Sequence, residues 1–224
     1  METPDFKKIA EQLRNPNGQD GLETADRMAV NNGGMIRSCI DHLFLTENSR
    51  ILELGFGGGG HVPYLLAKAE GLQYSGVDIS ETMTGMAVAA NAGAIAAGIA
   101  DFQTVLPQNG YVTLPYATDT FDQAFTVNTI YFWDNAPAQA AEIYRVLKPG
   151  GPFITCFATE AFMKELPFTQ YGFNLYSVEQ AKQLLEEAGF TVQSCEEETE
   201  TVMSNAGPLM ERTFILLCVT KLAE

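Results

Sequence analysis

A cluster of glycines flanked by two acidic residues is the part of this sequence best suited to chemistry. Glu53 stands just before the glycine-rich segment 55–60, and Asp78 follows Gly55 by 23 residues. A turn made of glycines has few Cβ atoms, so a ligand can lie against its backbone. A carboxylate at a strand end is costly unless it meets water or a ligand, and it suits ribose hydroxyls or an ammonium group. The pattern predicts a nucleotide-type ligand site at these residues.

Two known motifs fit the glycine cluster. Gly55-x-Gly57-x-x-Gly60 is the dinucleotide fingerprint, and Glu53-x-Gly55-x-Gly57-x-Gly59 is the form that accompanies S-adenosylmethionine. Asp78 does not separate them, because both folds place an acid on ribose at this point. Three features favour the second motif. Glu53 suits the ammonium of an amino-acid group on the ligand. The segments 114–122 and 145–151 precede the fourth and fifth strands. A chain of 224 residues leaves no room for the substrate domain that many dehydrogenases carry.

Short apolar strands that alternate with helices must position these residues. We expect strands at 50–54, 73–77, 101–106, 121–128, 153–157, 191–195 and 212–220. We expect helices at 61–68, 81–98, 137–147 and 177–188, the last opened by a capping box from Ser177 to Gln180. This alternation predicts an α/β fold with a doubly wound, seven-stranded sheet, mostly parallel and ending in an antiparallel hairpin.

The segment before the first strand predicts an N-terminal helical cap. Thr3 suits a helix N-cap and Pro4 the first helical position, with the helix continuing to Leu13. We expect a second helix after residue 24, a break at 31–34, and a third helix over 35–45. The chain is then one domain, 1–224, with the cap at 1–48 and the catalytic core at 49–224. The acidic run 196–200 is expected to be a solvated loop.

Composition excludes several kinds of protein. There are 28 Asp and Glu against 13 Lys and Arg, a net charge of −15, which counts against a nucleic-acid-binding surface. Two histidines cannot build a multi-histidine metal centre, so no metal is expected. Four cysteines without a C-x-x-C pair indicate reduced thiols and a cytoplasmic protein. The apolar stretch 86–100 is shorter than the roughly 20 residues that a membrane span requires, so we expect no membrane partner.

Four segments together carry a family resemblance: ILELGFGGG, GVDIS, LPYATDTFDQAF and EIYRVLKPGG. In order and spacing over residues 50–155 they resemble the class I S-adenosylmethionine-dependent methyltransferases, in particular the type 11 small-molecule group. The resemblance implies a Rossmann-like fold, S-adenosyl-L-methionine as cofactor, and in-line methyl transfer to a small molecule. Such a transfer depends mainly on positioning and desolvation.

The resemblance also implies roles for particular residues. Glu53 faces the methionine amino end, Asp78 holds the ribose, Ile79 flanks the adenine and Asn128 lies beside the methionine moiety. The cofactor backbone is lined by Gly55, Phe56, Gly57 and Gly59. Family members often carry an acid for the adenine amino group where this chain has Asn109-Gly110-Tyr111. We therefore expect a backbone group near Gly110, or the Asn109 amide, to serve there.

On the acceptor side, the candidate catalytic residues are Tyr131, His61 and Asp134. Aromatic residues in the segment 160–176, after the fifth strand, predict an apolar or aromatic acceptor pocket. Two alternatives stay open: an NAD(P)-dependent oxidoreductase and a non-catalytic module that binds S-adenosylmethionine. We expect a small-molecule substrate and allow for a homodimer.

Overall fold

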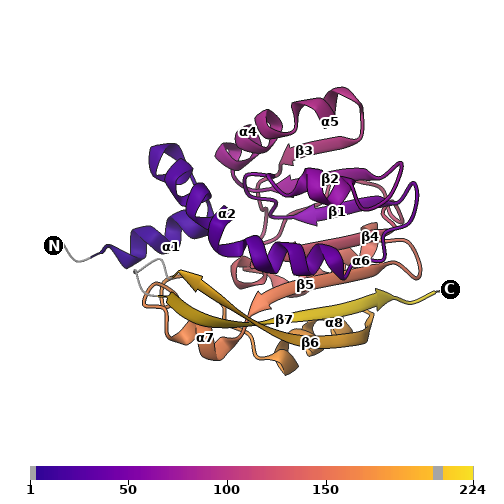
Figure 1. Ribbon diagram of the computed structural model, residues 1–224. Helices are drawn as coiled ribbons and strands as arrows, with labels where there is room; N and C mark the ends of the chain where they lie inside the picture. The colour runs from indigo at the N-terminus through magenta and orange to yellow at the C-terminus, as the bar shows by residue number, and fades with distance from the viewer. Residues whose placement is uncertain (1–3, 204–208, 224) are drawn as a thin grey trace.

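A seven-stranded sheet forms the centre of the computed structural model, which describes residues 4–203 and 209–223 (Figure 1). The strands are β1 (Arg50–Leu54), β2 (Gln73–Asp78), β3 (Ala100–Thr104), β4 (Gln123–Val127), β5 (Pro152–Ala158), β6 (Phe190–Met203) and β7 (Leu209–Lys221). They lie in the order β3-β2-β1-β4-β5-β7-β6. β1 to β5 pair in parallel, and β7 is antiparallel to both β5 and β6. The predicted doubly wound sheet with its terminal hairpin is confirmed.

Helices cover both faces of this sheet. They are α1 (Phe6–Arg14), α2 (Gly18–Asp41), α3 (Val62–Leu66), α4 (Glu81–Ala90), α5 (Ala92–Ala96), α6 (Ala136–Val146), α7 (Glu160–Lys164) and α8 (Val178–Glu187), with a 3-10 turn at Ile130–Phe132. The predicted capping box between Ser177 and Gln180 opens α8. The expected helix 81–98 is divided at Asn91, whose side-chain amide donates to the carbonyls of Ala87 and Gly59.

The N-terminal helices differ from the prediction in two ways. Asp5, which accepts from the backbone N–H of Lys8, caps α1, so Pro4 precedes the helix. Thr3 lies outside the described residues. α2 is a single helix that runs through 31–34, so the expected break there is wrong. Contacts from distant parts of the chain override the weak helix propensity of asparagine and glycine at this point.

The acidic run 196–200 belongs to β6, and the expected solvated loop is wrong. Successive side chains of a strand point to opposite faces, so every second acid shares a face. Glu196 contacts His42, and Glu198 accepts from Ser38. Glu200 pairs with Arg212 of β7 and lies against Gly34 of α2. We call Glu196, Glu198 and Glu200 the acidic ladder, and its contacts fasten α2 to the hairpin.

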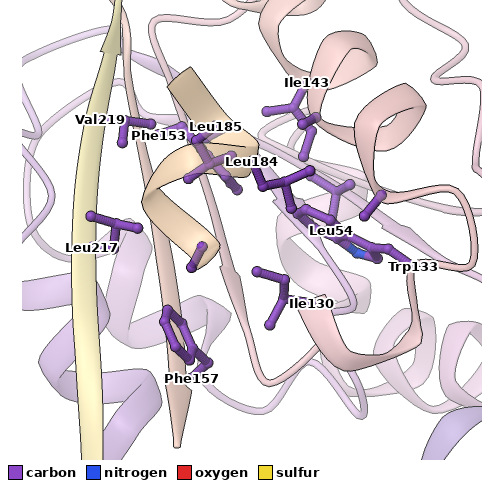
Figure 2. Packing of buried hydrophobic residues seen from close by; sticks show 14 of the residues in the cluster. Leu54, Ile130, Trp133, Ile143, Phe153, Phe157, Leu184, Leu185, Leu217 and Val219 are labelled. Atoms are coloured by element: carbon purple, nitrogen blue, oxygen red, sulfur yellow. The ribbon is translucent and has the colours of Figure 1, made fainter. Parts of the chain in front are cut away.

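Two apolar clusters, one on each face of the sheet, hold these layers together. Figure 2 shows Leu184 and Leu185 of α8 beside Phe153 of β5 and Val219 of β7. The other cluster joins the second half of α2 to β4 and β5, through residues such as Met35. β4 is buried along its whole length, as expected for a central parallel strand. Within residues 4–203 and 209–223, no helix has the length and apolar character needed to cross a membrane.

Candidate active site

A cavity of about 510 Å³ opens at the carboxyl ends of β1, β2 and β4. The order of the strands reverses between β1 and β4, and open α/β sheets bind their ligands at such a point. Every predicted site residue except Tyr131 and Asn109 lines this cavity. The lining therefore includes Glu53, Gly55, Phe56, Gly57, Gly59, His61, Asp78, Ile79, Gly110, Asn128 and Asp134.

Glu53 is the most deeply buried acid of the site, with 1% of its surface exposed. Its Oε2 accepts from the hydroxyl of Tyr74 at 2.5 Å and from Nε2 of His61 at 2.7 Å. Burial acts to lower the pKa of His61, but the charge and hydrogen bond of Glu53 outweigh it and raise that pKa. Both bonds fall on one oxygen, so Oε1 takes part in neither and can accept from a cationic ligand.

Asp78 ties the second strand to the glycine loop. Its Oδ2 accepts from the backbone N–H of Gly57 at 3.2 Å, and its Oδ1 accepts from that of Ser80 at 2.9 Å. Burial raises the pKa of Asp78 to about 6, although these N–H groups favour the ionised form. A carboxylate held in this way stands ready for ribose hydroxyls at the cavity wall.

The glycine loop needs glycine at defined positions. Gly55 has φ +76°, and a Cβ on it would lie 2.3 Å from Cγ2 of Thr129. Gly59 has φ +67°, and a Cβ there would lie 2.8 Å from Cβ of Ala87. Gly57 also has a positive φ, but a Cβ would meet nothing within 4 Å, so its backbone is open to the cavity. This cradle fits a ligand that lies flat on the backbone.

Phe56 contributes to the cavity in a different way from its glycine neighbours. It is buried, and its ring lies edge-on to Phe102 at 5.2 Å between centroids. It also occupies the space above Gly76, where a Cβ would lie 2.6 Å from its ring. The side chain of Phe56 therefore belongs to the core, and the backbone is what it offers to a ligand.

Asn128 lies at the end of β4 and is held from two sides. It has a positive φ of 57°, and its side-chain amide donates to Oδ1 of Asn32 at 3.2 Å. Its Oδ1 accepts from the hydroxyl of Tyr131 at 3.2 Å, and that hydroxyl also lies 3.1 Å from the carbonyl of Ala158. Burial raises the pKa of Tyr131 well above its usual range. Tyr131 is thus a buried, neutral hydrogen-bond donor that positions Asn128.

A tight turn occupies residues 108–111, where members of the resembled family often carry an acid for the adenine amino group. Asn109 and Gly110 have φ of +54° and +83°, and Gln108 and Tyr111 pair across them, which is the geometry of an Asn-Gly type I′ turn. The carbonyl of Gly110 accepts from the backbone N–H of Asn135 at 2.8 Å. The turn is therefore docked on the start of α6.

The cap helices supply a wall of the cavity that sequence reasoning missed. The residues from α1, α2 and their connection are Leu13, Arg14, Pro16, Ala25, Asp26, Met28, Ala29, Asn32, Gly33, Ile36 and Arg37. Arg14 also forms an ion pair with Asp134, which joins α1 to the loop after β4. The spacing of Ala25, Met28, Asn32 and Ile36 marks one face of a helix and was a usable signal.

A second, smaller hollow of about 100 Å³ adjoins the large cavity. Both are lined by Leu13, Met28, Asn32, Asn128 and Phe132. The remaining lining is mainly apolar and includes Phe162, Met163, Leu166, Phe168 and Phe173 from the segment after β5. We call it the apolar chamber. Among the described residues, no group of three or more His, Cys, Asp or Glu could hold a metal ion.

Comparison with known proteins agrees with this geometry. Residues 52–155 match the family model described as a methyltransferase domain. An uncharacterized methyltransferase, YdaC of Bacillus subtilis, is 30% identical over 124 residues, which are 55% of this chain and 64% of that protein. Phosphoethanolamine N-methyltransferase 1 of Arabidopsis thaliana is 25% identical over 78% of this chain and 35% of its own length. The chain thus spans under two thirds of each of these curated relatives.

Solved structures show the same fold. A Haemonchus contortus phosphoethanolamine N-methyltransferase 2, solved with phosphomonomethylethanolamine and S-adenosylhomocysteine, superposes with a TM-score of 0.69 at 16% identity. The match covers 98% of this chain and 61% of that one. The match of residues 52–155 to the methyltransferase domain favours the methyltransferase interpretation over the oxidoreductase alternative. The strand order, the matched segment 52–155 and these relatives support a class I S-adenosylmethionine-dependent methyltransferase fold for this chain, and they indicate S-adenosylmethionine as its cofactor.

Proposed function

We propose that this protein transfers a methyl group from S-adenosylmethionine to a small apolar or aromatic acceptor. The observation that carries the proposal is the junction of the two hollows at Asn128, Phe132 and Met28. One hollow holds the buried acids and the glycine loop, and the other is lined mainly by apolar side chains. A donor and an acceptor placed in these hollows meet at that junction.

The chain's own residues supply orientation and exclusion of water. The cofactor, when bound, supplies a methyl group on a sulfonium that an in-line displacement can transfer. Glu53 holds the ammonium group of the cofactor, and Asp78 holds its ribose. Asn128 fixes the loop after β4, which lies between the methyl donor and the acceptor. A water-poor chamber strengthens the electrostatic contacts within it, and correct placement lowers the barrier by several kcal/mol.

The predicted acceptor-side residues have other partners, which bears on the kind of acceptor. His61 is bonded to Glu53, Asp134 is paired with Arg14, and Tyr131 donates its hydroxyl to fixed acceptors. Nε2 of His61, Oδ2 of Asp134 and the hydroxyl of Tyr131 are therefore already engaged within the protein. We infer that the acceptor atom reacts without a protein base, as a neutral amine, an ionised thiol or an activated carbon does.

We further infer that the cap and the core work as one domain. α2 contributes side chains to both hollows, and the acidic ladder fastens it to the terminal hairpin. Arg14 of α1 adds a link to the loop after β4. The cap therefore closes the site over its ligands.

Binding and turnover test the proposal separately. S-adenosylhomocysteine should raise the melting temperature, because it binds only the native state, whereas NADH should not. Glu53→Gln should weaken S-adenosylhomocysteine binding by roughly 10- to 100-fold, since a charge-assisted hydrogen bond is lost. Phe162→Ala should leave that binding unchanged and raise the KM for the acceptor.

The acceptor is sought by incubating the protein with methyl-labelled cofactor and a panel of amines, thiols, phenols and carbon acids of graded size. Label transfer to apolar members that fit the chamber supports the proposal. A protein that binds the cofactor yet methylates no member contradicts it and favours a non-catalytic module. A melting shift with NADH alone would return the assignment to an oxidoreductase.

A further inference from the structure

Among the described residues that line the apolar chamber, Arg212 of β7 is the only one with a charged side chain. The side chain is only 7% exposed, although its neighbours in the chamber are mainly apolar. A buried guanidinium is costly unless its N–H groups find acceptors. The partners of Arg212 therefore decide what a ligand in the chamber meets.

The guanidinium of Arg212 carries one N–H on Nε and two on each of its terminal nitrogens. Oε1 of Glu200 accepts from Nε at 3.2 Å and from Nη2 at 2.6 Å, and the carbonyl of Asn31 accepts from Nη2 as well. Nη1 donates to Oδ1 of Asn32 at 3.3 Å. Its second N–H has no acceptor among the described residues, and we call it the open N–H.

Nη1 belongs to the polar end of the chamber, beside the junction with the large cavity. Its partner Asn32 lines both hollows, whereas Glu200, the partner of Nε and Nη2, lines neither. Oδ1 of Asn32 also accepts from the side-chain amide of Asn128 at 3.2 Å. These three side chains form a polar row at the junction, and an oxygen atom of a ligand in the chamber can accept the open N–H there.

The acids beside Arg212 determine what charge that ligand oxygen should carry. Glu200 already neutralises Arg212, and Glu198, which shares its face of β6, adds negative charge. A carboxylate on the ligand would therefore be a buried charge without a cation of its own, which is costly. A neutral carbonyl oxygen accepts the same N–H and adds no charge, so a carbonyl fits this place better than a carboxylate.

We propose that the acceptor is an apolar molecule with a neutral carbonyl group, and that Arg212 selects it by donating the open N–H to the carbonyl oxygen. The apolar body of the acceptor lies among Phe162, Phe168 and Phe173, and its carbonyl lies beside the junction of the two hollows. Ketones, esters and amides carry such a group, and hydrocarbons and free acids do not. This inference deepens the proposed function and rests on it.

Three probes of similar size separate a carbonyl from its alternatives. Acetophenone carries a ketone on a benzene ring, isopropylbenzene carries a methyl group in place of that oxygen, and benzoate carries a carboxylate. The affinity of each probe is measured by ligand-detected NMR, with the protein saturated with S-adenosylhomocysteine. The double variant Glu200→Gln, Arg212→Met removes the donor and leaves no unpaired charge. Glu200→Gln alone is the matched control, because it keeps the guanidinium.

The wild-type protein should bind acetophenone about tenfold more tightly than benzoate, because only benzoate adds a buried charge. The double variant should lower the affinity for acetophenone relative to isopropylbenzene by about tenfold, since one charge-assisted hydrogen bond is lost. Glu200→Gln should leave that ratio unchanged. It should raise the affinity for benzoate relative to acetophenone by about tenfold, because the charge of Arg212 is then unpaired.

An unchanged ratio of acetophenone to isopropylbenzene in the double variant overturns the inference, and so does a wild-type preference for benzoate. If the double variant does not fold, Glu200→Gln decides: a gain of benzoate supports the inference, and its absence overturns it. A wild-type protein that binds S-adenosylhomocysteine but none of the three probes refutes the chamber as the acceptor site, and the proposed function fails with it.

Discussion

The glycine loop and the cap are both walls of the same cavity, but they are fixed by contacts of very different range. In the loop, Gly57 is hydrogen-bonded to Asp78, which is 21 residues away in the sequence, and His61 is hydrogen-bonded to Glu53, which is 8 residues away. In the cap, Ser38 is hydrogen-bonded to Glu198, which is 160 residues away in the sequence, and Asn31 is hydrogen-bonded to Arg212, which is 181 residues away. Short-range contacts form with little loss of chain entropy and leave a readable motif, whereas long-range contacts depend on the completed sheet.

The largest expected effect is on the loop. Gly55→Val should lower the free energy of unfolding by about 4 kcal/mol, from a strained positive φ and a clash with Thr129. Urea denaturation without ligand measures it. Gly57→Val is the matched control, since Gly57 also has a positive φ, +54°, but a side chain there meets no neighbour, and it should cost about 2 kcal/mol. Equal losses would show that the contact with Thr129 is unimportant.

A somewhat smaller effect is expected at the cap. Arg212→Met leaves Glu200 and the Asn31 carbonyl without their cationic partner in a mostly buried place and should cost about 3 kcal/mol. Hydrogen exchange should speed up in α2 and remain unchanged in the glycine loop. The double variant Glu200→Gln, Arg212→Met should recover part of the loss, because no unpaired charge remains. Faster exchange in both regions would mean that loop and cap are not independent.

The acid Asp78 makes the stability of the loop depend on pH. Its pKa is raised by burial from 3.8 to about 6 in the folded protein, so the native state binds the proton more tightly than the unfolded state. The free energy of unfolding of the ligand-free protein should therefore fall by roughly 2 kcal/mol as the pH rises from about 4 to about 6. Asp78→Asn should remove this fall, as measured by urea denaturation at each pH. A fall of the same size in Asp78→Asn would assign it to other groups.

The smallest effect is expected at a single rung of the acidic ladder. Glu198→Gln weakens the bond to Ser38, which is partly exposed, and should cost about 0.5–1 kcal/mol. Thermal denaturation detects a loss of this size as a shift of a few degrees. The matched control is Glu197→Gln, on the opposite face of β6 and exposed to solvent, where no change is expected. Equal shifts in the two variants would contradict the ladder's role.

The predictions from sequence were right where one short segment contained the whole motif. The strand at 50–54, the glycine loop, Asp78 and the capping box at Ser177 all appear as predicted. They failed at residues 31–34 and 196–200, where asparagine, glycine and glutamate were judged by their local preferences. Those residues are helical or extended because of partners on the other element, and no local pattern reports a partner some 160 residues away.

The sequence by itself predicted the succession of strands along the chain, the resemblance to the methyltransferases and the acids proposed to meet the cofactor, because these depend on hydrophobic periodicity and on a turn that only glycine permits. The tertiary structure alone decided that the cap lines both hollows, that Tyr131 is a buried donor, and that Asp134 stands beside Gly110. Side chains from separate loops acquire a shared environment only when the sheet brings their strand ends together. Burial, hydrogen bonding and charge at that edge then fix what each group can do.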